Sequence, residues 1–320
     1  MNDLTAFRLI PYWNHETPFR LIPYWMRLIL LKIILLCHSK PDSSPGKESL
    51  MTNVRLPAVA GVFYPKEPDT LLAMVEKMLE EALLKTPPAI TSRGTPRALV
   101  VPHAGFLYSG PIAASAYCLL SKLNPPPARV LLLGPSHRIF FKGIATSTAT
   151  SFGTPLGEIP VDRTFVDQME TLPGIDVYDP AHTQEHSIEV QLPFLEVQLG
   201  QVPIIPLVAG EASDSIVARI ITAVLKIPET LIVISTDLSH YLPSGQARLL
   251  DARTASAIVS PEYRPLDHQM ACGSHPLNGF LMAAHEAGLK GEILDLRNSG
   301  DTSGPNNEVV GYGSFAFWSP

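Results

Sequence analysis

The stretch that decides the fold is ALVVPHAG (residues 98–105), a short apolar run that leads into a proline, a histidine and a glycine. Two further apolar runs have the same design: VLLL (130–133) leads into GPSH (134–137), and LIVI (231–234) leads into STDLSH (235–240). Apolar runs without alternation are typical of strands that are covered on both faces, as in a parallel sheet packed between helices. The sequence therefore predicts an α/β fold with a mostly parallel central sheet.

Other elements are predicted from periodicity and from turn-forming residues. Asp69 precedes an amphipathic helical pattern and is predicted to be its N-cap. Residues 202–208 are a weaker strand candidate, because Pro203 and Pro206 interrupt the run and favour an edge position. A closing strand is predicted at Val309–Trp318. Further helical patterns cover Gly110–Leu123, Glu185–Leu199, Ser213–Leu225, Gln246–Ser260 and Leu277–Ala287. Together these elements predict helices on both faces of the sheet in a single domain.

Composition excludes several classes of protein. Of the 320 residues, 46% are hydrophobic and 17% are charged, whereas the usual charged share is about 25%. This balance excludes a disordered chain or a coiled coil. The net charge of −6 argues against a nucleic-acid partner, which would need a basic face. The three cysteines, at positions 37, 118 and 272, are too few for a disulfide framework, so we expect a reducing, cytoplasmic setting.

The first fifty residues differ in character from the rest. FRLIPYW occurs at residues 7–13 and again at 19–25, and the apolar stretch Met26–Cys37 follows. That stretch is shorter than the roughly 20 residues needed to cross a bilayer. We predict that residues 1–50 are a leader, either disordered or a mis-assigned start, and that the α/β domain covers residues 51–320. A membrane anchor is the less favoured alternative.

Histidines follow three of the predicted strands directly. In an open parallel sheet, ligands bind outside the carboxyl ends of the strands, where the loops converge. His103, His137 and His240 are therefore expected to meet at one rim of the sheet. Imidazole is a common metal ligand and the usual acid or base near neutral pH. Each histidine alone is better explained as a hydrogen-bonded loop residue, but the set favours metal or acid–base chemistry.

Several other segments carry polar groups, each with a structural alternative. EHSIE (185–189) is predicted to open a helix, where an acid and a histidine are equally well explained as ordinary N-terminal charge. Cys272 precedes a predicted helix, whose dipole favours a thiolate, although free cysteines usually only pack. Cys118 is expected to be inert. The remaining interpretations are turns or possible ligand contacts at Tyr108–Gly110 and Gly300–Gly304, and structural or surface roles for His15, His38, His268 and His285.

From about Val54 to Trp318 the chain resembles the Memo family, whose microbial members are often called AmmeMemoRadiSam system protein B. The resemblance rests on segments in the same order along the chain: PAVAGVFYP (57–65), PHAGFLYSG (102–110), GPSH (134–137), EHSIEVQLPFL (185–195), STDLSHY (235–241), CGSHP (272–276) and GDTSG (300–304). Nothing in residues 1–50 takes part.

This resemblance implies a fold similar to class III extradiol ring-cleaving dioxygenases, with a mononuclear metal cleft. It implies one iron or copper ion per chain, held by His103, His137 and Cys272. Asp237 and His240 would line the same cleft, with His240 in the place of the acid–base histidine of the dioxygenases, and His186 would be a further neighbour. We expect His240, Asp237 and His186 to be the catalytic residues if the protein is an enzyme.

The resemblance leaves several functions open. Those dioxygenases bind Fe(II) through two histidines and a carboxylate, whereas Cys272 is a softer ligand that favours Cu(I) or a more covalent iron site. A metal-dependent oxidoreductase therefore fits better than ring cleavage. One alternative is a peptide- or ligand-binding adaptor, since an animal member is known as a signalling adaptor. Another is a partner subunit that works with a radical enzyme and a second small protein, as the family's naming implies.

Overall fold

The computed structural model describes residues 53–121, 123 and 125–320. The leader predicted at residues 1–50 lies outside these residues, so both the leader and the domain start at residue 51 stay predictions. The strands are β1 (Val54–Arg55), β2 (Ala98–Val101), β3 (Arg129–Pro135), β4 (Ile144–Thr146), β5 (Ser151–Thr154), β6 (Gly157–Pro160), β7 (Ile175–Val177), β8 (Ile204–Ala209), β9 (Thr230–Ser235), β10 (His240–Leu242), β11 (Lys290–Asn298) and β12 (Val309–Trp318). The α-helices are α2 (Pro68–Lys85), α3 (Pro88–Thr91), α4 (Phe106–Tyr117), α5 (Arg163–Met169), α6 (Pro180–Thr183), α7 (Leu192–Leu199), α8 (Asp214–Leu225), α9 (Ser244–Ile258) and α10 (Ser274–Glu286). Short 3₁₀ turns are η2 (Cys118–Leu120), η3 (Glu189–Gln191) and η4 (Ser299–Asp301).

Neighbouring parallel strands form the core of the larger sheet, in the order β2-β9-β3-β8. Every residue of β2 and of β9 is buried, which explains why both sequences are almost wholly apolar. The three strands predicted from apolar runs are thus confirmed. Because these strands are parallel and adjacent, their carboxyl ends lie at one edge of the sheet.

The rest of the nine-stranded sheet is mixed, which corrects the prediction of a mostly parallel sheet. β12 pairs antiparallel with β2, β10 and β11, and β4 pairs antiparallel with β8 and parallel with β7. The predicted closing strand has the bounds of β12, but β12 lies inside the sheet. Most of β11 is only half-buried, so its sequence lacks the continuous apolar run of the core strands.

A strand, β8, forms in the region predicted at residues 202–208, but the prediction that it lies at an edge of the sheet is wrong. β8 lies between β3 and β4. The Val130 N–H donates to the Pro203 carbonyl, so in this parallel ladder Pro206 faces away from β3. On that side β4 pairs only with Val208 and Ala209. Pro206 has no N–H to donate, and at this position it removes no hydrogen bond from either ladder.

A separate three-stranded sheet has the order β1-β5-β6 and was not predicted. Its first strand carries Arg55, a buried side chain that donates to the carbonyls of His182 and Glu185 and pairs with the Glu189 carboxylate. Glu189 also accepts hydrogen bonds from the Tyr64 hydroxyl and from backbone N–H groups. This buried network joins the first described strand to the segment that follows α6.

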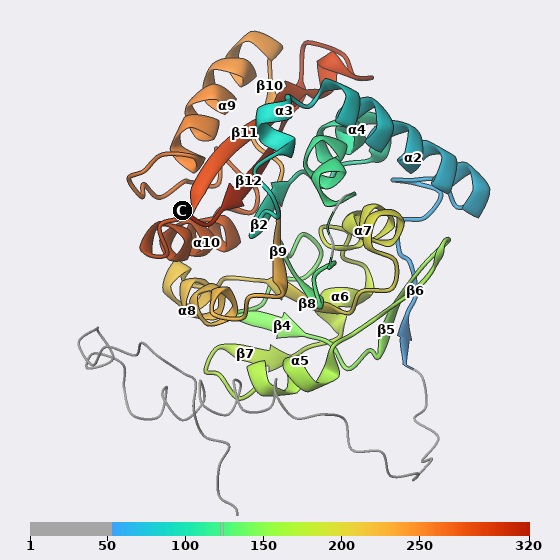
Figure 1. Ribbon diagram of the computed structural model, residues 1–320, viewed down its shortest axis with the longest axis vertical. Helices are drawn as coiled ribbons and strands as arrows, with labels where there is room; N and C mark the ends of the chain where they lie inside the picture. Colours follow the sequence, from blue (N-terminus) through green and yellow to red (C-terminus); the bar gives the residue numbers. More distant parts are fainter. Residues whose placement is uncertain (1–52, 122, 124) are drawn as a thin grey trace, which may run out of the picture. The chain divides into compact units, whose positions relative to one another are not determined.

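Helices cover both faces of the larger sheet, as predicted. Figure 1 shows α8, α9 and α10 on one side of the central strands and α2, α4 and α7 on the other. α10 packs against α8, β3 and β9, whereas α4 packs against β2 and β12. Gly279 allows the close approach of α10 and α8, because a Cβ there would lie 2.2 Å from the Cβ of Val217. Among the described helices, none combines the length and the apolar character needed to span a bilayer.

Two helices, α2 and α4, begin earlier than predicted. α2 begins at Pro68 with Glu67 as N-cap, so Asp69 lies in the first helical turn instead of capping it. Proline is favoured at the first helical position, because its missing N–H would have had no partner there. α4 begins at Phe106, ahead of the predicted start at Gly110.

α7 begins later than predicted, at Leu192 instead of Glu185. The Glu185 carboxylate accepts hydrogen bonds from the backbone N–H groups of His186 and Ser187 and holds this segment in a turn. Such a local bond between side chain and backbone competes with helix formation. The EHSIE segment therefore forms a turn that leads into η3, and Glu185 and His186 do not lie in the first turn of α7.

Candidate metal centre

The loops that follow β2, β3 and β9 meet at one edge of the sheet. His103 follows β2, His137 follows β3 and Asp237 follows β9, and β9 lies between the other two strands. The parallel core therefore brings His103 and His137 together, as predicted, whereas His240, the third histidine predicted at this edge, is not in the close group. A fourth contributor, His186, comes from the loop ahead of α7.

Three imidazoles form the centre of this site. One ring nitrogen of each of His103, His137 and His186 can be chosen so that all three atoms lie within 4.8 Å of one another. The ring centroids of His103 and His137 are 4.9 Å apart, those of His137 and His186 are 4.7 Å apart, and those of His103 and His186 are 5.6 Å apart. We call these three residues the histidine cluster.

His103 is the most buried member of the cluster, with 2% of its surface exposed. Its Nδ1 lies 2.9 Å from the Ser235 hydroxyl, and its backbone N–H donates to the Asp237 carboxylate at 2.7 Å. Burial, followed by repulsion from His137 and His186, lowers the pKa of His103 well below the ordinary value of histidine. His103 is therefore a neutral imidazole at neutral pH.

His137 is more accessible and is held by a buried carboxylate. The Glu185 carboxylate accepts from the His137 backbone N–H at 2.6 Å and lies 3.0 Å from the His137 Nδ1. Burial acts to raise the pKa of Glu185, but hydrogen bonds and charge attraction from His137 outweigh it and lower the pKa to about 2. Glu185 is thus a carboxylate that orients His137.

His186 lies against Phe63, with ring centroids 4.8 Å apart in an edge-on arrangement. Its Nδ1 is buried and has no hydrogen-bond partner among the described residues, although it lies 3.2 Å from a Glu185 oxygen. Burial lowers the pKa of His186 to about 4, against the attraction of Glu185. His186 was predicted as a neighbour of the metal site, and one of its ring nitrogens lies within 4.8 Å of a nitrogen of each of the other two imidazoles.

Cys272 lies beside the cluster, with its Sγ 3.3 Å from the His103 Nε2. The Asp237 backbone N–H points at the same sulfur from 3.3 Å. Burial, followed by the negative charge of Asp237, raises the pKa of Cys272 to about 12. The sequence predicts that the dipole of α10 favours a thiolate at Cys272. With these residues alone, the effect of burial on the pKa outweighs that of the helix end, so the neutral thiol is favoured.

Asp237 lies on the loop after β9, and His240 is the first residue of β10. Burial raises the pKa of Asp237 to about 7, in spite of the hydrogen bond from the His103 N–H. The Nδ1 of His240 lies 2.9 Å from the Leu238 carbonyl, and burial lowers its pKa. His240 is not one of the three mutually close imidazoles.

The other segments noted in the sequence have structural roles. The Ser109 hydroxyl donates to the Ala104 carbonyl, and Tyr108 is partly exposed on α4. Gly300–Gly304 overlaps η4, which has a capping box formed by Asn298 and Asp301. Cys118 is buried, as expected. His268 and His285 are exposed, whereas His15 and His38 lie outside the described residues.

Sequence reasoning did not assign three residues that surround the cluster: Glu185, Ser235 and Gln191. Glu185 was read as helix-terminal charge, yet it is fully buried beside His137. Gln191 is also fully buried and donates to Ser235. The sequence signal that could have identified Gln191 is a glutamine inside a largely apolar pattern, because a buried polar side chain needs hydrogen-bond partners.

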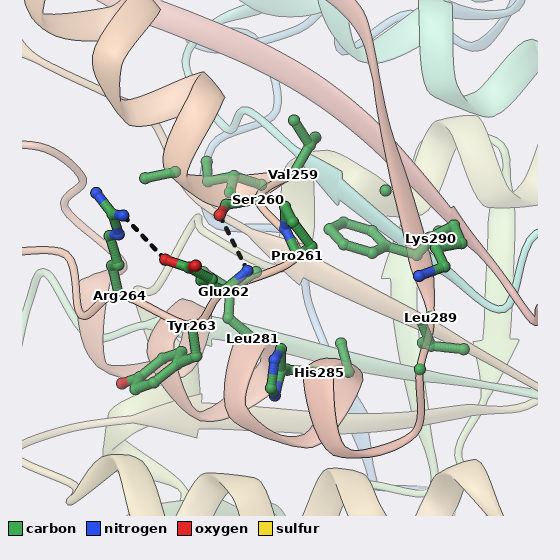
Figure 2. Close-up of a pocket in the computed structure, with 16 residues that line it drawn as sticks. Val259, Ser260, Pro261, Glu262, Tyr263, Arg264, Leu281, His285, Leu289 and Lys290 are labelled. Carbon is green, nitrogen blue, oxygen red and sulfur yellow. Dashed lines mark hydrogen bonds and ion pairs between the residues drawn. The ribbon is translucent and has the colours of Figure 1, made fainter.

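A separate hollow of about 350 Å³ lies at the opposite end of the sheet (Figure 2). Phe317 lines it and pairs with Ala98 at the start of β2, whereas His103 follows the end of β2. Figure 2 shows Arg264 paired with Glu262, whose backbone N–H is bonded to the Ser260 hydroxyl. These polar groups bind one another, and the lining includes no residue of the histidine cluster.

Comparison with known proteins identifies the family that this chain resembles. The profile of a family described as "Memo-like protein" matches residues 55–316. A MEMO1 family protein of Sulfolobus acidocaldarius is 35% identical, in an alignment that covers 82% of this chain and 99% of the relative. A MEMO1 family protein of Aquifex aeolicus is also 35% identical, over 81% of this chain and 97% of the relative. An uncharacterized protein of known structure from Escherichia coli K12 aligns with 68% of this chain and 99% of its own, with 13% identity and a TM-score of 0.44, too weak a likeness to bear on the fold.

Proposed function

This chain belongs to the Memo family, and on that premise we propose that it holds one iron or copper ion at His103, His137 and Cys272. The observations that support the proposal are the closeness of His103 and His137 within the histidine cluster and the Cys272 sulfur 3.3 Å from the His103 Nε2. Metal–nitrogen and metal–sulfur bonds of about 2.0 and 2.3 Å in a tetrahedral site would separate nitrogen from sulfur by about 3.5 Å. The observed spacing is close to that value.

The protonation states of these residues suit a metal. A histidine binds a metal through the lone pair of its neutral ring. Burial keeps the pKa values of His103 and His186 below neutrality. The Glu185 carboxylate beside the His137 Nδ1 is the kind of partner that orients a metal-binding histidine. A bound cation would also convert the Cys272 thiol, with its pKa of about 12, into a thiolate.

His186 is the rival for the third position. A site of three imidazoles would use His186 in place of Cys272, and both donor sets share His103 and His137. We favour Cys272, because its sulfur lies at ligand spacing from the His103 Nε2, and we place His186 as a neighbour that excludes water. Thiolate ligation would favour Cu(I) or a covalent iron site over a hard, oxygen-loving ion.

The protein would then act as a metal-dependent oxidoreductase. Iron or copper, when bound, supplies one-electron or oxygen chemistry. Asp237, with a pKa raised to about 7, is suited to exchange a proton near neutral pH. His240, neutral and hydrogen-bonded to Leu238, is the second candidate for proton transfer. The similarity to class III extradiol dioxygenases belongs to this proposal, although the sulfur ligand argues against ring cleavage itself.

Elemental analysis of anaerobically purified protein tests the proposal. We expect about one iron or copper ion per chain, as for a mononuclear site, and loss of that ion in the His137→Ala and Cys272→Ser variants. The His275→Gln variant, in which an exposed histidine of α10 is changed, should keep the ion. Unchanged metal content in His137→Ala would refute the metal site. Metal retained in Cys272→Ser but lost in His186→Gln would instead assign the three-imidazole donor set.

Oxygen uptake with a reductant tests the oxidoreductase reading separately. The metal-loaded protein should consume oxygen, and Asp237→Asn should slow this uptake while metal content stays the same.

A peptide-binding adaptor or a partner subunit of a radical enzyme has no supporting observation among the described residues, so both stay predictions.

A further inference from the structure

A chain of buried polar side chains leads to the Nδ1 of His103. The Tyr117 hydroxyl lies 3.0 Å from the Gln191 Oε1, the Gln191 Nε2 lies 3.0 Å from the Ser235 Oγ, and that Oγ lies 2.9 Å from the His103 Nδ1. Tyr117, Gln191 and Ser235 have no exposed surface, and His103 has 2%. Because these side chains are buried, each of these bonds needs one donor and one acceptor.

The direction of the chain is fixed at Gln191 by a backbone carbonyl. A carbonyl oxygen can only accept a hydrogen bond. The atom of Gln191 that lies 2.9 Å from the Pro102 carbonyl must therefore be the amide nitrogen, and the same nitrogen donates to Ser235. The Gln191 oxygen then accepts from the Tyr117 hydroxyl.

A second carbonyl fixes the direction at Ser235. The Ser235 hydroxyl lies 2.5 Å from the Ser187 carbonyl, so its single hydrogen points there. The same oxygen already accepts from Gln191. Only a lone pair is left toward His103, and the His103 Nδ1 must supply the hydrogen of that bond.

We propose that Ser235 is a positioning residue that fixes His103 as the Nδ1–H tautomer, with its lone pair on Nε2 facing the Cys272 sulfur. The contact on the other side of the ring agrees with this tautomer, since a neutral Cys272 thiol 3.3 Å from Nε2 can donate to it. The consequence for metal binding rests on the proposed function, but the tautomer itself is a property of the protein without metal.

Nitrogen NMR tests the tautomer directly. Full-length protein labelled with ¹⁵N-histidine, treated with chelator, would be studied by long-range ¹H–¹⁵N correlation at neutral pH, and the His103 signals assigned by their loss in His103→Gln. We expect a protonated Nδ1 and an unprotonated Nε2. A protonated Nε2 in the wild-type protein would overturn the inference, whatever the variants do.

Three variants then test the part played by Ser235. Ser235→Ala should shift His103 to a mixture of tautomers, whereas Ser235→Thr, which keeps the hydroxyl, should retain the Nδ1–H form. Ser314→Ala is the matched control, because Ser314 is a buried serine whose hydroxyl has no hydrogen-bond partner in the part of the chain that the structure describes. An unchanged His103 tautomer in Ser235→Ala would show that the hydroxyl does not set it.

Metal affinity is the second measurement. Changes to residues that orient metal-binding histidines weaken metal binding by roughly 10–100-fold. We expect that loss for Fe(II) in Ser235→Ala, measured by competition with a chelator, and no loss in Ser235→Thr or Ser314→Ala. Wild-type protein that binds no Fe(II) or Cu(I) would refute the proposed function and leave the tautomer to be judged by NMR alone.

Discussion

Glu185 and Ser235 perform the same task for two different histidines. Each faces the Nδ1 of an imidazole, at 3.0 Å for His137 and 2.9 Å for His103. Glu185 does so with a charge and Ser235 with a neutral hydroxyl. The carboxylate partner belongs to the more accessible histidine, and the neutral partner belongs to the fully buried one.

We expect Glu185→Gln to weaken metal binding. The amide keeps the size of the side chain but removes the charge that orients His137, so Fe(II) affinity should fall by roughly 10–100-fold. Competition with a chelator would measure the Fe(II) affinity. The control is Glu196→Gln on α7, a half-buried glutamate bonded to Thr154 instead of a histidine. Equal affinity of Glu185→Gln and wild type would contradict this role.

His182 should make stability depend on pH. Burial lowers its pKa to about 4, and its Nε2 donates to the Ala145 carbonyl. The unfolded chain, with an ordinary histidine pKa of about 6.5, binds the proton more readily, so stability rises with pH between about 4 and 6.5 and is complete above that window. The contribution is about 3 kcal/mol.

Urea denaturation across that pH window measures this effect. His182→Gln, which keeps a donor for Ala145, should show a shallower slope of stability against pH than the wild type. His285→Gln, which changes an exposed histidine, should keep the wild-type slope. Parallel curves for wild type and His182→Gln would rule out His182 as the source.

At the level of elements, the irregular segment between α6 and α7 contributes more to the site than any helix. Its His186 belongs to the histidine cluster, and its Glu185 faces His137. Its Ser187 carbonyl accepts the hydrogen bond of the Ser235 hydroxyl, and its Glu189 pairs with Arg55 of β1. A helix would have presented these residues at a fixed rotation and could not have turned them all inward. The segment is instead held by β1 from one side and by β9 from the other.

We expect Arg55→Met to destabilise the protein by about 3–5 kcal/mol, because it leaves the Glu189 carboxylate buried without its counter-charge. Equilibrium unfolding in urea would measure the loss. Arg248→Met is the control, since Arg248 and Asp301 form an exposed pair, for which about 0–1 kcal/mol is expected. Similar losses in both variants would argue against a buried ionic anchor.

At the scale of the whole molecule, metal binding should raise thermal stability. A ligand that binds only the folded chain at a hundredfold excess over its Kd adds about 2.7 kcal/mol. For a domain of this size we expect Tm to rise by roughly 5–10 °C. Calorimetric scans with Fe(II) or Cu(I) under anaerobic conditions would show the shift, and chelator should reverse it. A similar rise in the His137→Ala variant would place the ion elsewhere.

The sequence by itself determined the core strands and the site residues that directly follow them. A strand buried on both faces must be apolar throughout, so 98–101, 130–133 and 231–234 could be recognised without knowledge of their neighbours. The convergence of His103 and His137 followed from the rule for parallel sheets. Family membership followed from the same segments and is confirmed by the comparisons.

Only the tertiary structure decided which polar groups face one another. Pairing of β4, β10 and β11 depends on contacts between residues far apart in the chain, and so does the interior position of β8. The closeness of His186 to the other imidazoles, and the hydrogen bonds of Glu185, Ser235 and Gln191, depend on an irregular loop held by β1 and β9. Local periodicity reports which face of an element is buried, but it carries no information about the partners that a loop meets there.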